Sequence, residues 1–348
     1  METKVKILDI NNIDYEAIKA AALILKRGGL VVFPTETVYG LGADALNENA
    51  VNNIFKAKGR PQDNPLIVHV GSFDMVTSLV KEIPPAAKKI MDKFFPGPIT
   101  VIMEKSDLVP MVTSAGLNTV GIRMPENIIA RELIREAGVP VAAPSANTSG
   151  LPSPTEVKRC VEDLDGKVDF ILGGGKCDYG LESTVIDCSV YPPVILRPGR
   201  VTLEALKEID ENIYIDSGLI TGNERPKAPG MKYKHYAPKA KVKIIQGSMQ
   251  KTVEKINEIV QNYRDDKSKV GIMATDETKD LYKQGIVISL GSRNDEETIG
   301  SNLFETLRTL DDFKVDLILS ESFEESGIGI AIMNRLKKSA GFDIIKAD

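Results

Sequence analysis

The stretch PTETVYGLGA, residues 34–43, decides how the rest of this chain is interpreted. It follows the apolar run Leu30–Phe33, which has the pattern of a buried strand, and it contains two glycines one residue apart. A strand that leads into hydroxyls and glycines typically presents backbone N–H groups and small side chains to a ligand. An ordinary strand-to-turn connection has the same local composition, so the surrounding sequence must decide between the two interpretations.

The N-terminal part mixes short strands and helices without strict alternation, which predicts a compact α/β domain with a mixed sheet over residues 1–207. The apolar periodicity predicts helices at 14–27, 48–57, 84–94 and 127–137. It predicts strands at 5–9, 66–70, 99–103, 119–123, 168–172, 183–187 and 193–197.

A regular alternation of strands and helices begins after residue 240 and predicts a smaller, Rossmann-like parallel α/β domain over 241–348. Its strands are expected at 241–246, 269–274, 286–290 and 315–320, and its helices at 249–264, 276–284, 295–312 and 328–340. Residues 208–240 lack this periodicity and include a segment rich in Gly, Pro, Ser and Asn at 217–230. We therefore interpret 208–240 as a linker.

Composition argues against several classes of protein. The chain has 348 residues, of which 42% are hydrophobic and 27% charged, a balance typical of a globular protein with two domains. Its net charge of −5 argues against a polycation that wraps nucleic acid, so any RNA contact must be local. Three cysteines without a CxxC motif argue against a disulfide framework or a Cys-rich zinc site. Because no leader segment or membrane-length apolar run is visible, we expect a cytoplasmic protein without a membrane partner.

Several familiar catalytic motifs are missing or incomplete. No GxxxxGK[ST] occurs, and GGGKC at 173–177 lacks the first glycine and the hydroxyl of a P-loop, so a tight turn is favoured there. GLGADA at 40–45 resembles a dinucleotide fingerprint, but it is too far from the preceding strand for the required strand–turn–helix. The two histidines of the chain leave no plausible Ser/His/Asp set.

Two pairs of polar side chains stand at the ends of predicted elements. Lys58 and Arg60 flank a glycine directly after a helix, and Ser145 and Asn147 flank an alanine directly after a strand. Two fixed cations with a hydroxyl and an amide make a suitable cradle for a phosphate ester. Taken singly, each residue also fits a surface or turn position.

Two further arginines and the two histidines have alternative interpretations. Arg123 ends a predicted strand and could pair with a carboxylate, and Arg197 could meet a phosphate oxygen, although both patterns also fit surface cations. His69 lies inside an apolar strand, where a hydrogen-bonded core histidine is the simpler interpretation. His235 lies in MKYKHY (231–236), which fits a solvated basic loop or, with its interleaved tyrosines, a nucleic-acid contact.

Seven motifs together resemble a known family. In chain order they are PTETVYGLG (34–42), KGRPQDNPL (58–66), PGPIT (96–100), GIRMP (121–125), APSANTSGLPSPT (143–155), EST (182–184) and ILRPG (195–199). They resemble the motifs of the L-threonylcarbamoyladenylate synthase family, the YrdC-like proteins. The linker segment APGMKYKHYAP (228–238) and the half that follows it resemble the longer, two-domain branch of that family.

The resemblance implies a reaction and a fold. L-Threonine, bicarbonate or CO2, and ATP with Mg²⁺ give L-threonylcarbamoyl-AMP, pyrophosphate and water. A separate tRNA threonylcarbamoyl transferase then uses the adenylate to make N6-threonylcarbamoyladenosine in tRNA. The implied N-terminal fold is a twisted, mixed α/β domain with an open concave surface, followed by a Rossmann-like domain.

The resemblance also implies roles for particular residues. The catalytic set at the nucleotide corresponds to Lys58, Arg60, Ser145 and Asn147. The L-threonine-binding set corresponds to Thr35, His69, Arg123 and Ser183. Further ATP contacts correspond to Thr119, Ser153, Arg197 and, in a linker that closes over the site, Tyr233 or His235. No side chain is assigned to a metal, and Gly40 and Gly42 would let the chain bend beneath Thr35.

Two alternatives share the implied fold. An RNA-binding module would use the concave surface without making an adenylate, and a weak tRNA contact is compatible with either function. The carbamoyltransferases that mature hydrogenases carry zinc-finger cysteines and additional domains, which three scattered cysteines do not supply. The sequence indicates no ligand for the C-terminal domain, because GIGIA at 327–331 is only a weak phosphate-binding pattern.

Overall fold

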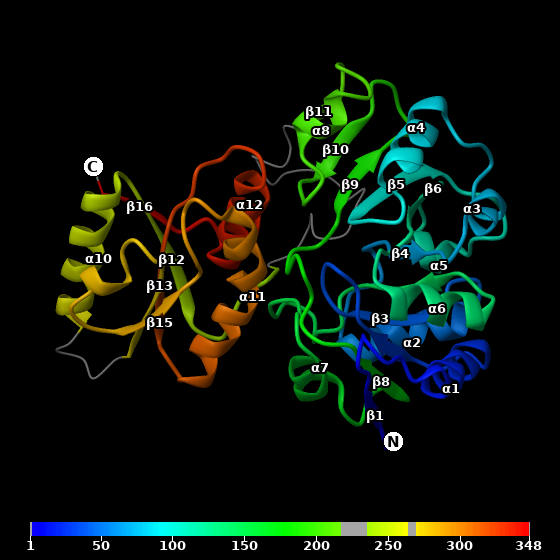
Figure 1. The fold of residues 1–348 in the computed structure, drawn as a ribbon, viewed down its shortest axis with the longest axis horizontal. Helices are drawn as coiled ribbons and strands as arrows, with labels where there is room; N and C mark the ends of the chain where they lie inside the picture. The colour runs from blue at the N-terminus through cyan, green and yellow to red at the C-terminus, as the bar shows by residue number, and fades with distance from the viewer. Residues whose placement is uncertain (1, 217–234, 264–268, 348) are drawn as a thin grey trace. The chain divides into compact units, whose positions relative to one another are not determined.

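The computed structural model describes residues 2–216, 235–263 and 269–347, and the chain divides into two units (Figure 1). The first unit consists of Met1–Ser149, Ser153–Asp178 and Glu182–Tyr233. The second unit consists of Lys234–Asp348 together with two three-residue segments, Gly150–Pro152 and Tyr179–Leu181. The predicted domain limits at 207 and 240 stay predictions, since 217–234 lie outside the described residues.

The first unit is built on a mixed sheet, as predicted. Its strands are β1 (Lys4–Ile7), β2 (Val31–Phe33), β3 (Gly40–Asp44), β4 (Ile67–His69), β5 (Ile99–Glu104), β6 (Thr119–Arg123), β7 (Val141–Ala142), β8 (Phe170–Gly173), β9 (Thr184–Asp187), β10 (Val194–Arg197) and β11 (Tyr214–Ile215). In space the described strands follow the order β1-β8-β2-β3-β7-β4-β6-β5-β9-β10-β11. Parallel pairs such as β4–β6 stand beside antiparallel pairs such as β5–β6.

Helices pack on both faces of this sheet. They are α1 (Tyr15–Lys26), α2 (Glu48–Lys58), α3 (Phe73–Leu79), α4 (Pro85–Phe94), α5 (Met111–Ser114), α6 (Ile128–Ala137), α7 (Val157–Leu164) and α8 (Leu203–Lys207). Ile54 of α2, Ile90 of α4 and Leu164 of α7 belong to one apolar core. The helices α1 and α6 lie side by side and share a second core with β2, β7 and β8 (Figure 1).

Local sequence sets the ends of α2, which carries the first candidate site residue. The side chain of Asn47 accepts hydrogen bonds from the backbone N–H groups of Asn49 and Ala50, so the helix begins there. Gly59 adopts a left-handed backbone with φ of 62°, which ends the helix directly after Lys58. The helix end therefore presents the Lys58 side chain at a defined position.

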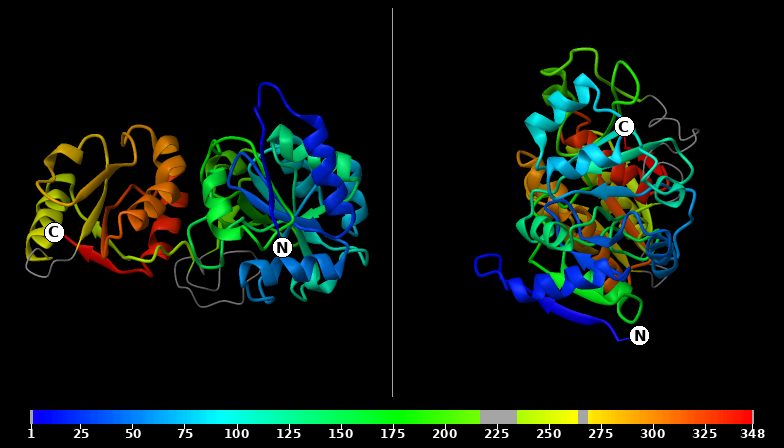
Figure 2. Two further views of the ribbon diagram at one scale, coloured as in Figure 1. Left: turned by 90° about the horizontal axis from the view of Figure 1, so that it is seen from below. Right: turned by 90° about the vertical axis from the view of Figure 1, so that its right-hand side faces the viewer.

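The second unit has a parallel sheet, as predicted. Its described strands, in the spatial order β14-β13-β15-β12-β16, are β14 (Ile286–Ser289), β13 (Val270–Ala274), β15 (Leu317–Glu321), β12 (Lys241–Gln246) and β16 (Ile344–Lys346). The helix α10 (Met249–Tyr263) lies on one side of the sheet, and α11 (Glu296–Asp312) and α12 (Gly329–Ser339) lie on the other (Figures 1 and 2). Within the described ranges, no helix of either unit is long and apolar enough to cross a membrane.

The predicted helix 276–284 is wrong, because only a short 3-10 turn, η2 (Lys279–Leu281), forms there. A buried carboxylate draws the polar side chains of this segment away from helix formation. Glu321 accepts hydrogen bonds from the hydroxyls of Thr275, Thr278 and Tyr282, with 2.6 Å between Tyr282 Oη and Glu321 Oε1. Arg293 forms an ion pair with the same carboxylate. We call Glu321 and these four residues the Glu321 cluster.

Candidate active site

Strand register places many of the candidate residues on one face of the first sheet. His69 in β4 is the register partner of Arg123 in β6, and Thr100 in β5 is the partner of Val185 in β9. Because side chains alternate across a strand, residues two apart share a face. Traced from β4 to β10, one face carries Ile67, His69, Thr119, Gly121, Arg123, Thr100, Ile102, Ser183, Val185 and Arg197. We call this surface the polar face.

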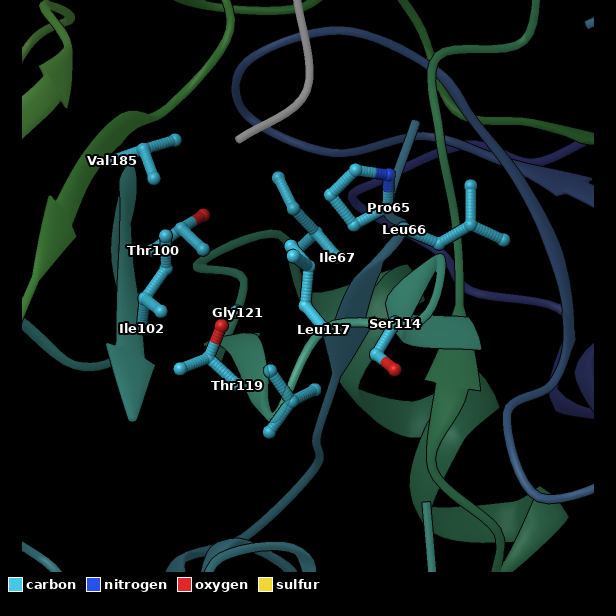
Figure 3. A pocket seen from close by; sticks show the side chains of 11 residues that line it. Pro65, Leu66, Ile67, Thr100, Ile102, Ser114, Leu117, Thr119, Gly121 and Val185 are labelled. Atoms are coloured by element: carbon cyan, nitrogen blue, oxygen red, sulfur yellow. The ribbon is translucent and has the colours of Figure 1, made fainter. Parts of the chain in front are cut away.

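A small hollow, with an internal volume of about 10 Å³, lies on the polar face (Figure 3). Most of its lining is apolar, and three hydroxyls interrupt it; the lining residues are Pro65, Leu66, Ile67, Thr100, Ile102, Ser114, Leu117, Thr119, Val120, Gly121 and Val185. Mainly apolar walls with a few placed polar groups are typical of pockets that bind small molecules. Of the predicted ATP contacts, Thr119 belongs to this lining.

A buried chain of hydrogen bonds joins the hollow to a cation. Oγ1 of Thr100, in the lining, lies 2.8 Å from Oγ of Ser183. Arg197 donates from Nη2 to the same Ser183 hydroxyl at 3.0 Å and from Nε to the Ser183 backbone oxygen at 3.0 Å. The structure thus brings the predicted ATP contact Arg197 and the predicted threonine contact Ser183 into direct contact beside the hollow.

A buried ion pair and a neutral histidine occupy the adjoining part of the polar face. Arg123 Nη2 lies 2.7 Å from Glu36 Oε1, and both side chains are at most 5% exposed. Burial, followed by the positive charge of Arg123, lowers the pKa of His69 to about 3, so its imidazole is neutral at pH 7. Nδ1 of His69 and Nε of Arg123 are buried without a hydrogen-bond partner among the described residues. Such atoms are rare in folded proteins and are available to a substrate or to water.

The predicted phosphate cradle is held together by direct contacts. Nζ of Lys58 donates to the backbone oxygens of Ser145 and Asn147, and the Ser145 hydroxyl donates to Asn147 Oδ1 at 2.5 Å. Lys58 itself is only 2% exposed. Nη2 of Arg60 lies 3.4 Å from the backbone oxygen of Pro65, a residue of the hollow. Three of the four predicted catalytic residues therefore touch one another, and the fourth lies beside the hollow.

Residues 34–43 contribute to both parts of the candidate site, the ion pair of Arg123 and the phosphate cradle. The Thr35 hydroxyl donates to the Val38 backbone oxygen at 2.6 Å and so closes a tight local turn, while direct contact with threonine stays a prediction. The proposed bending role of Gly40 and Gly42 is wrong, because both lie within the strand β3. They are needed for space, since a Cβ on Gly42 would lie 2.8 Å from the Phe33 ring. Gly40 also bridges to Ser145, which ties this stretch to the cradle.

The remaining predicted contacts are distributed over both units. Ser153 in the first unit donates its hydroxyl to Glu182 Oε1 at 2.6 Å, and both residues are buried. Tyr233 lies outside the described residues. His235 belongs to the second unit, where its half-buried ring lies 5.7 Å from the ring of Tyr236.

Sequence reasoning missed three functional candidates within the quoted motifs. Glu36 is the buried partner of Arg123, Glu182 is the partner of Ser153, and Thr100 joins the hollow to Ser183. A carboxylate inside an otherwise apolar or hydroxyl-rich motif is the signal that could have identified the two glutamates. Among the residues that the structure describes, no group of three or more His, Cys, Asp or Glu could hold a metal ion.

Comparisons with known proteins identify the family of this chain. A family model described as "Telomere recombination" matches residues 23–199, and one described as "Threonylcarbamoyl-AMP synthase, C-terminal domain" matches 201–341. The chain is 47% identical over 330 residues to the threonylcarbamoyl-AMP synthase of Pyrococcus abyssi, covering 94% of this chain and 95% of the relative. It is 46% identical over 330 residues to the Bacillus subtilis enzyme, covering 94% of each.

A solved structure, that of P. abyssi Sua5 complexed with L-threonine, matches with a TM-score of 0.94 at 45% identity over 99% of both chains. The fold and the site thus define a two-domain α/β enzyme of the nucleotidyltransferase class. The chain belongs to the threonylcarbamoyl-AMP synthase family, which confirms the resemblance drawn from its motifs.

Proposed function

We propose that this threonylcarbamoyl-AMP synthase joins L-threonine, bicarbonate or CO2, and ATP on the polar face of the first sheet and releases pyrophosphate. One observation carries the proposal: the face combines an apolar hollow, the buried pair Arg197–Ser183 and the buried pair His69–Arg123. The apolar side chains around the hollow offer a surface for a nucleobase to pack on, and the two arginines suit anionic groups on either substrate.

The chemistry requires no covalent enzyme intermediate. The amine of threonine attacks CO2 or bicarbonate to give a carbamate, and in the bicarbonate case water leaves. A carbamate oxygen then attacks the α-phosphorus of ATP, and the bond to the pyrophosphate oxygen breaks. The protein must therefore hold two anions together and spread the charge that develops on the phosphoryl group, which fixed cations and hydrogen-bond donors do well.

We assign the binding of the ATP phosphates to the cradle. Lys58, buried at the end of α2, fixes the backbone of Ser145 and Asn147 and supplies positive charge in a site of low dielectric constant. Arg60 and Arg197 add guanidinium groups, and Thr119 and Ser153 are the further nucleotide contacts. Mg²⁺ neutralises charge on the leaving pyrophosphate when it is bound with ATP. No side chain of this chain is assigned to it.

We assign the binding of L-threonine to the region of the Arg123–Glu36 ion pair and His69. Arg123 keeps Nε without a protein partner among the described residues and can donate to the threonine carboxylate. His69 is neutral, so its free ring nitrogen can accept a hydrogen bond from the substrate without adding charge. Ser183 and Thr35 supply hydroxyls of a size that suits an amino acid. We expect the linker around Tyr233 and His235 to exclude water, which protects the carbamate.

The product is an activated carbamoyl donor, and a separate tRNA threonylcarbamoyl transferase consumes it. Since ATP and tRNA meet in the cytoplasm, we propose that compartment for the reaction. A weak direct contact with tRNA is compatible with this assignment.

Pyrophosphate release measured with ATP and bicarbonate, with and without L-threonine, tests the proposal. We expect release that depends on threonine, together with a threonylcarbamoyl adenylate detected by mass spectrometry. Pyrophosphate release that is indifferent to threonine contradicts the assignment. Binding of RNA without threonine-dependent release would instead favour the RNA-binding alternative.

A further inference from the structure

We propose that helix α11 of the second unit positions two segments of the active site, and that Arg308 is the positioning residue on which this depends. The inference rests on the proposed function. Gly150–Pro152 and Tyr179–Leu181 belong to the second unit, although the residues on either side of each segment belong to the first. Each segment leads directly into a candidate site residue, Ser153 in one case and Glu182 in the other.

Arg308 holds the first segment through a buried, forked contact. Its Nε and Nη2 atoms both donate to the backbone oxygen of Pro152, at 3.0 and 2.7 Å. The Arg308 side chain is buried, so water screens these charge-assisted bonds little. The Gly150 oxygen at the other end of the segment accepts from the Ala237 backbone N–H at 2.9 Å. Both ends of the segment are thus bonded within the second unit.

The same helix holds the second segment by close packing. Gly180 has φ of 67°, and a Cβ built on it would lie 2.5 Å from the Cα of Ser301 in α11. The next residue, Leu181, packs on Gly300, where an added Cβ would lie 3.2 Å from Leu181 Cδ1. The first contact requires glycine, because Gly180 has a positive φ and a side chain there would meet the backbone of α11. At Gly300 an added Cβ would press on the end of the Leu181 side chain.

The two segments meet again inside the first unit. Ser153 follows the first segment and Glu182 follows the second, and their side chains form the hydrogen bond of 2.6 Å. The residue after Glu182 is Ser183, which binds Arg197 and Thr100. A shift of either segment on α11 therefore moves hydroxyls and a carboxylate that face ATP and threonine. Groups displaced in this way no longer match the positions of the bound substrates, so both substrates bind more weakly.

This arrangement gives the second unit a role without any ligand of its own. Its helix fixes the start of the Ser153 and Glu182 segments, so substrate affinity depends on contacts made within the second unit. Loss of those contacts should weaken binding of ATP and threonine, because the contact residues Ser153, Glu182 and Ser183 follow the two segments directly.

The test uses the full chain and threonine-dependent pyrophosphate release, with KM and kcat measured well below each variant's melting temperature. For Arg308→Ala we expect KM for ATP and threonine to rise about tenfold, because the Pro152 oxygen loses both donors. Arg308→Lys should recover part of that loss, since an ammonium supplies a donor but not the fork. Gly271→Ala is the matched control, since it forces a side chain to within 2.7 Å of Leu310 in the same unit but touches neither segment.

The control should lower the melting temperature while leaving both KM values unchanged. Wild-type KM values in Arg308→Ala overturn the inference, as does an equal KM rise in Gly271→Ala. If Arg308→Ala does not fold, Leu181→Ala, which only shortens the side chain of the second segment that packs on Gly300 of α11, replaces it with the same expected KM increase. Wild-type protein without threonine-dependent release contradicts the proposed function itself, so the two failures are distinguishable.

Discussion

Both sheets of this chain place polar side chains at buried strand ends, and the two sets satisfy their hydrogen bonds differently. In the second unit, both carboxylate oxygens of Glu321 accept from neighbours within the Glu321 cluster. In the first unit, Nδ1 of His69, Oδ1 of Asn64 and Oγ1 of Thr155 are buried without partners among the described residues. The contrast concerns the carboxylate, since Nε of Arg293 in the Glu321 cluster is also buried without a partner among the described residues. Neighbouring side chains satisfy both oxygens of Glu321, whereas His69, Asn64 and Thr155 each keep an atom that a substrate or water can bond.

Topology alone would have favoured the second sheet as a binding site. The chain leaves β13 toward β14 on one side and leaves β15 toward β16 on the other, so the sheet has a switch point between β13 and β15. Ligands of open α/β sheets commonly bind at such a point. Here Thr275 and Glu321, at the ends of these two strands, bond to each other. The protein's own side chains therefore link the two strand ends at the switch point.

The largest expected effect is on the phosphate cradle of the first unit. Lys58→Ala should reduce adenylate formation by roughly two to three orders of magnitude, because one fixed charge-stabilising group is lost. Single-turnover pyrophosphate release measures this rate. Lys56→Ala, on an exposed position of the same helix, is the control and should keep the wild-type rate. Near-normal release from Lys58→Ala would show that the cradle does not serve catalysis.

Matched carboxylate variants test the comparison between the two clusters directly. Glu36→Gln leaves Arg123 buried without its counter-charge, and we expect a loss of about 3 kcal/mol in the free energy of unfolding together with at least tenfold weaker activity. Glu321→Gln should cost about 1–2 kcal/mol, because Arg293 is partly exposed, and should leave activity unchanged. Denaturant unfolding and pyrophosphate release measure the two effects. A fully active Glu36→Gln variant would contradict a role of the Glu36–Arg123 pair in substrate binding. An inactive Glu321→Gln variant would contradict a purely structural role of the Glu321 cluster.

His69 makes the stability of the first unit depend on pH. Its folded pKa of about 3 lies below the usual value of 6.5, so below pH 6.5 the unfolded chain binds a proton that the folded chain does not. Stability is therefore complete above pH 6.5 and falls by up to about 1.4 kcal/mol per pH unit as the pH drops toward 3. Denaturant unfolding from pH 7 to pH 4 should show a steeper decline for the wild type than for His69→Gln. Parallel declines would contradict the neutral, buried histidine.

The smallest expected effect concerns a polar group whose bonds are complete within the first unit. Tyr39 Oη donates to the Gly175 backbone oxygen at 2.6 Å and accepts from the Gly174 N–H at 3.0 Å. Tyr39→Phe should cost about 1–2 kcal/mol of unfolding free energy and leave the rate of pyrophosphate release near wild type. Thermal unfolding and the pyrophosphate assay check both. A large loss of activity would mean that this glycine loop serves more than the structural role assigned to it.

Much of the fold could be predicted because local signals and tertiary packing agree. The apolar periodicity predicted helices at 14–27 and 48–57, and α1 and α2 form there because Asp14 and Asn47 cap them and Gly59 ends α2. The alternating pattern after residue 240 indicated the parallel sheet. The helix expected at 276–284 failed because Thr275 and Thr278 bond to a carboxylate 43 or more residues away. A single sequence does not show such long-range partners.

The candidate site was predicted through its motifs rather than through its geometry. Lysine, serine and asparagine positions could be inferred from their places at element ends, but the pairing of Arg123 with Glu36 could not. Glu36 lies 87 residues from Arg123, and only the folded sheet brings them together. The same holds for the hydroxyl chain from Thr100 to Arg197, which depends on the register of three strands.

The anchoring of Pro152 by Arg308 also sets an order of events during synthesis. The two residues are 156 positions apart, so at about 5–20 residues per second the ribosome needs roughly 8–30 s to produce Arg308 after Pro152. During that interval most of the first sheet can form, while the segments that lead into Ser153 and Glu182 still lack their helix. On the proposal that α11 positions these segments, the nascent chain acquires the residues of the predicted cradle early and the support for Ser153 and Glu182 only near the end of translation.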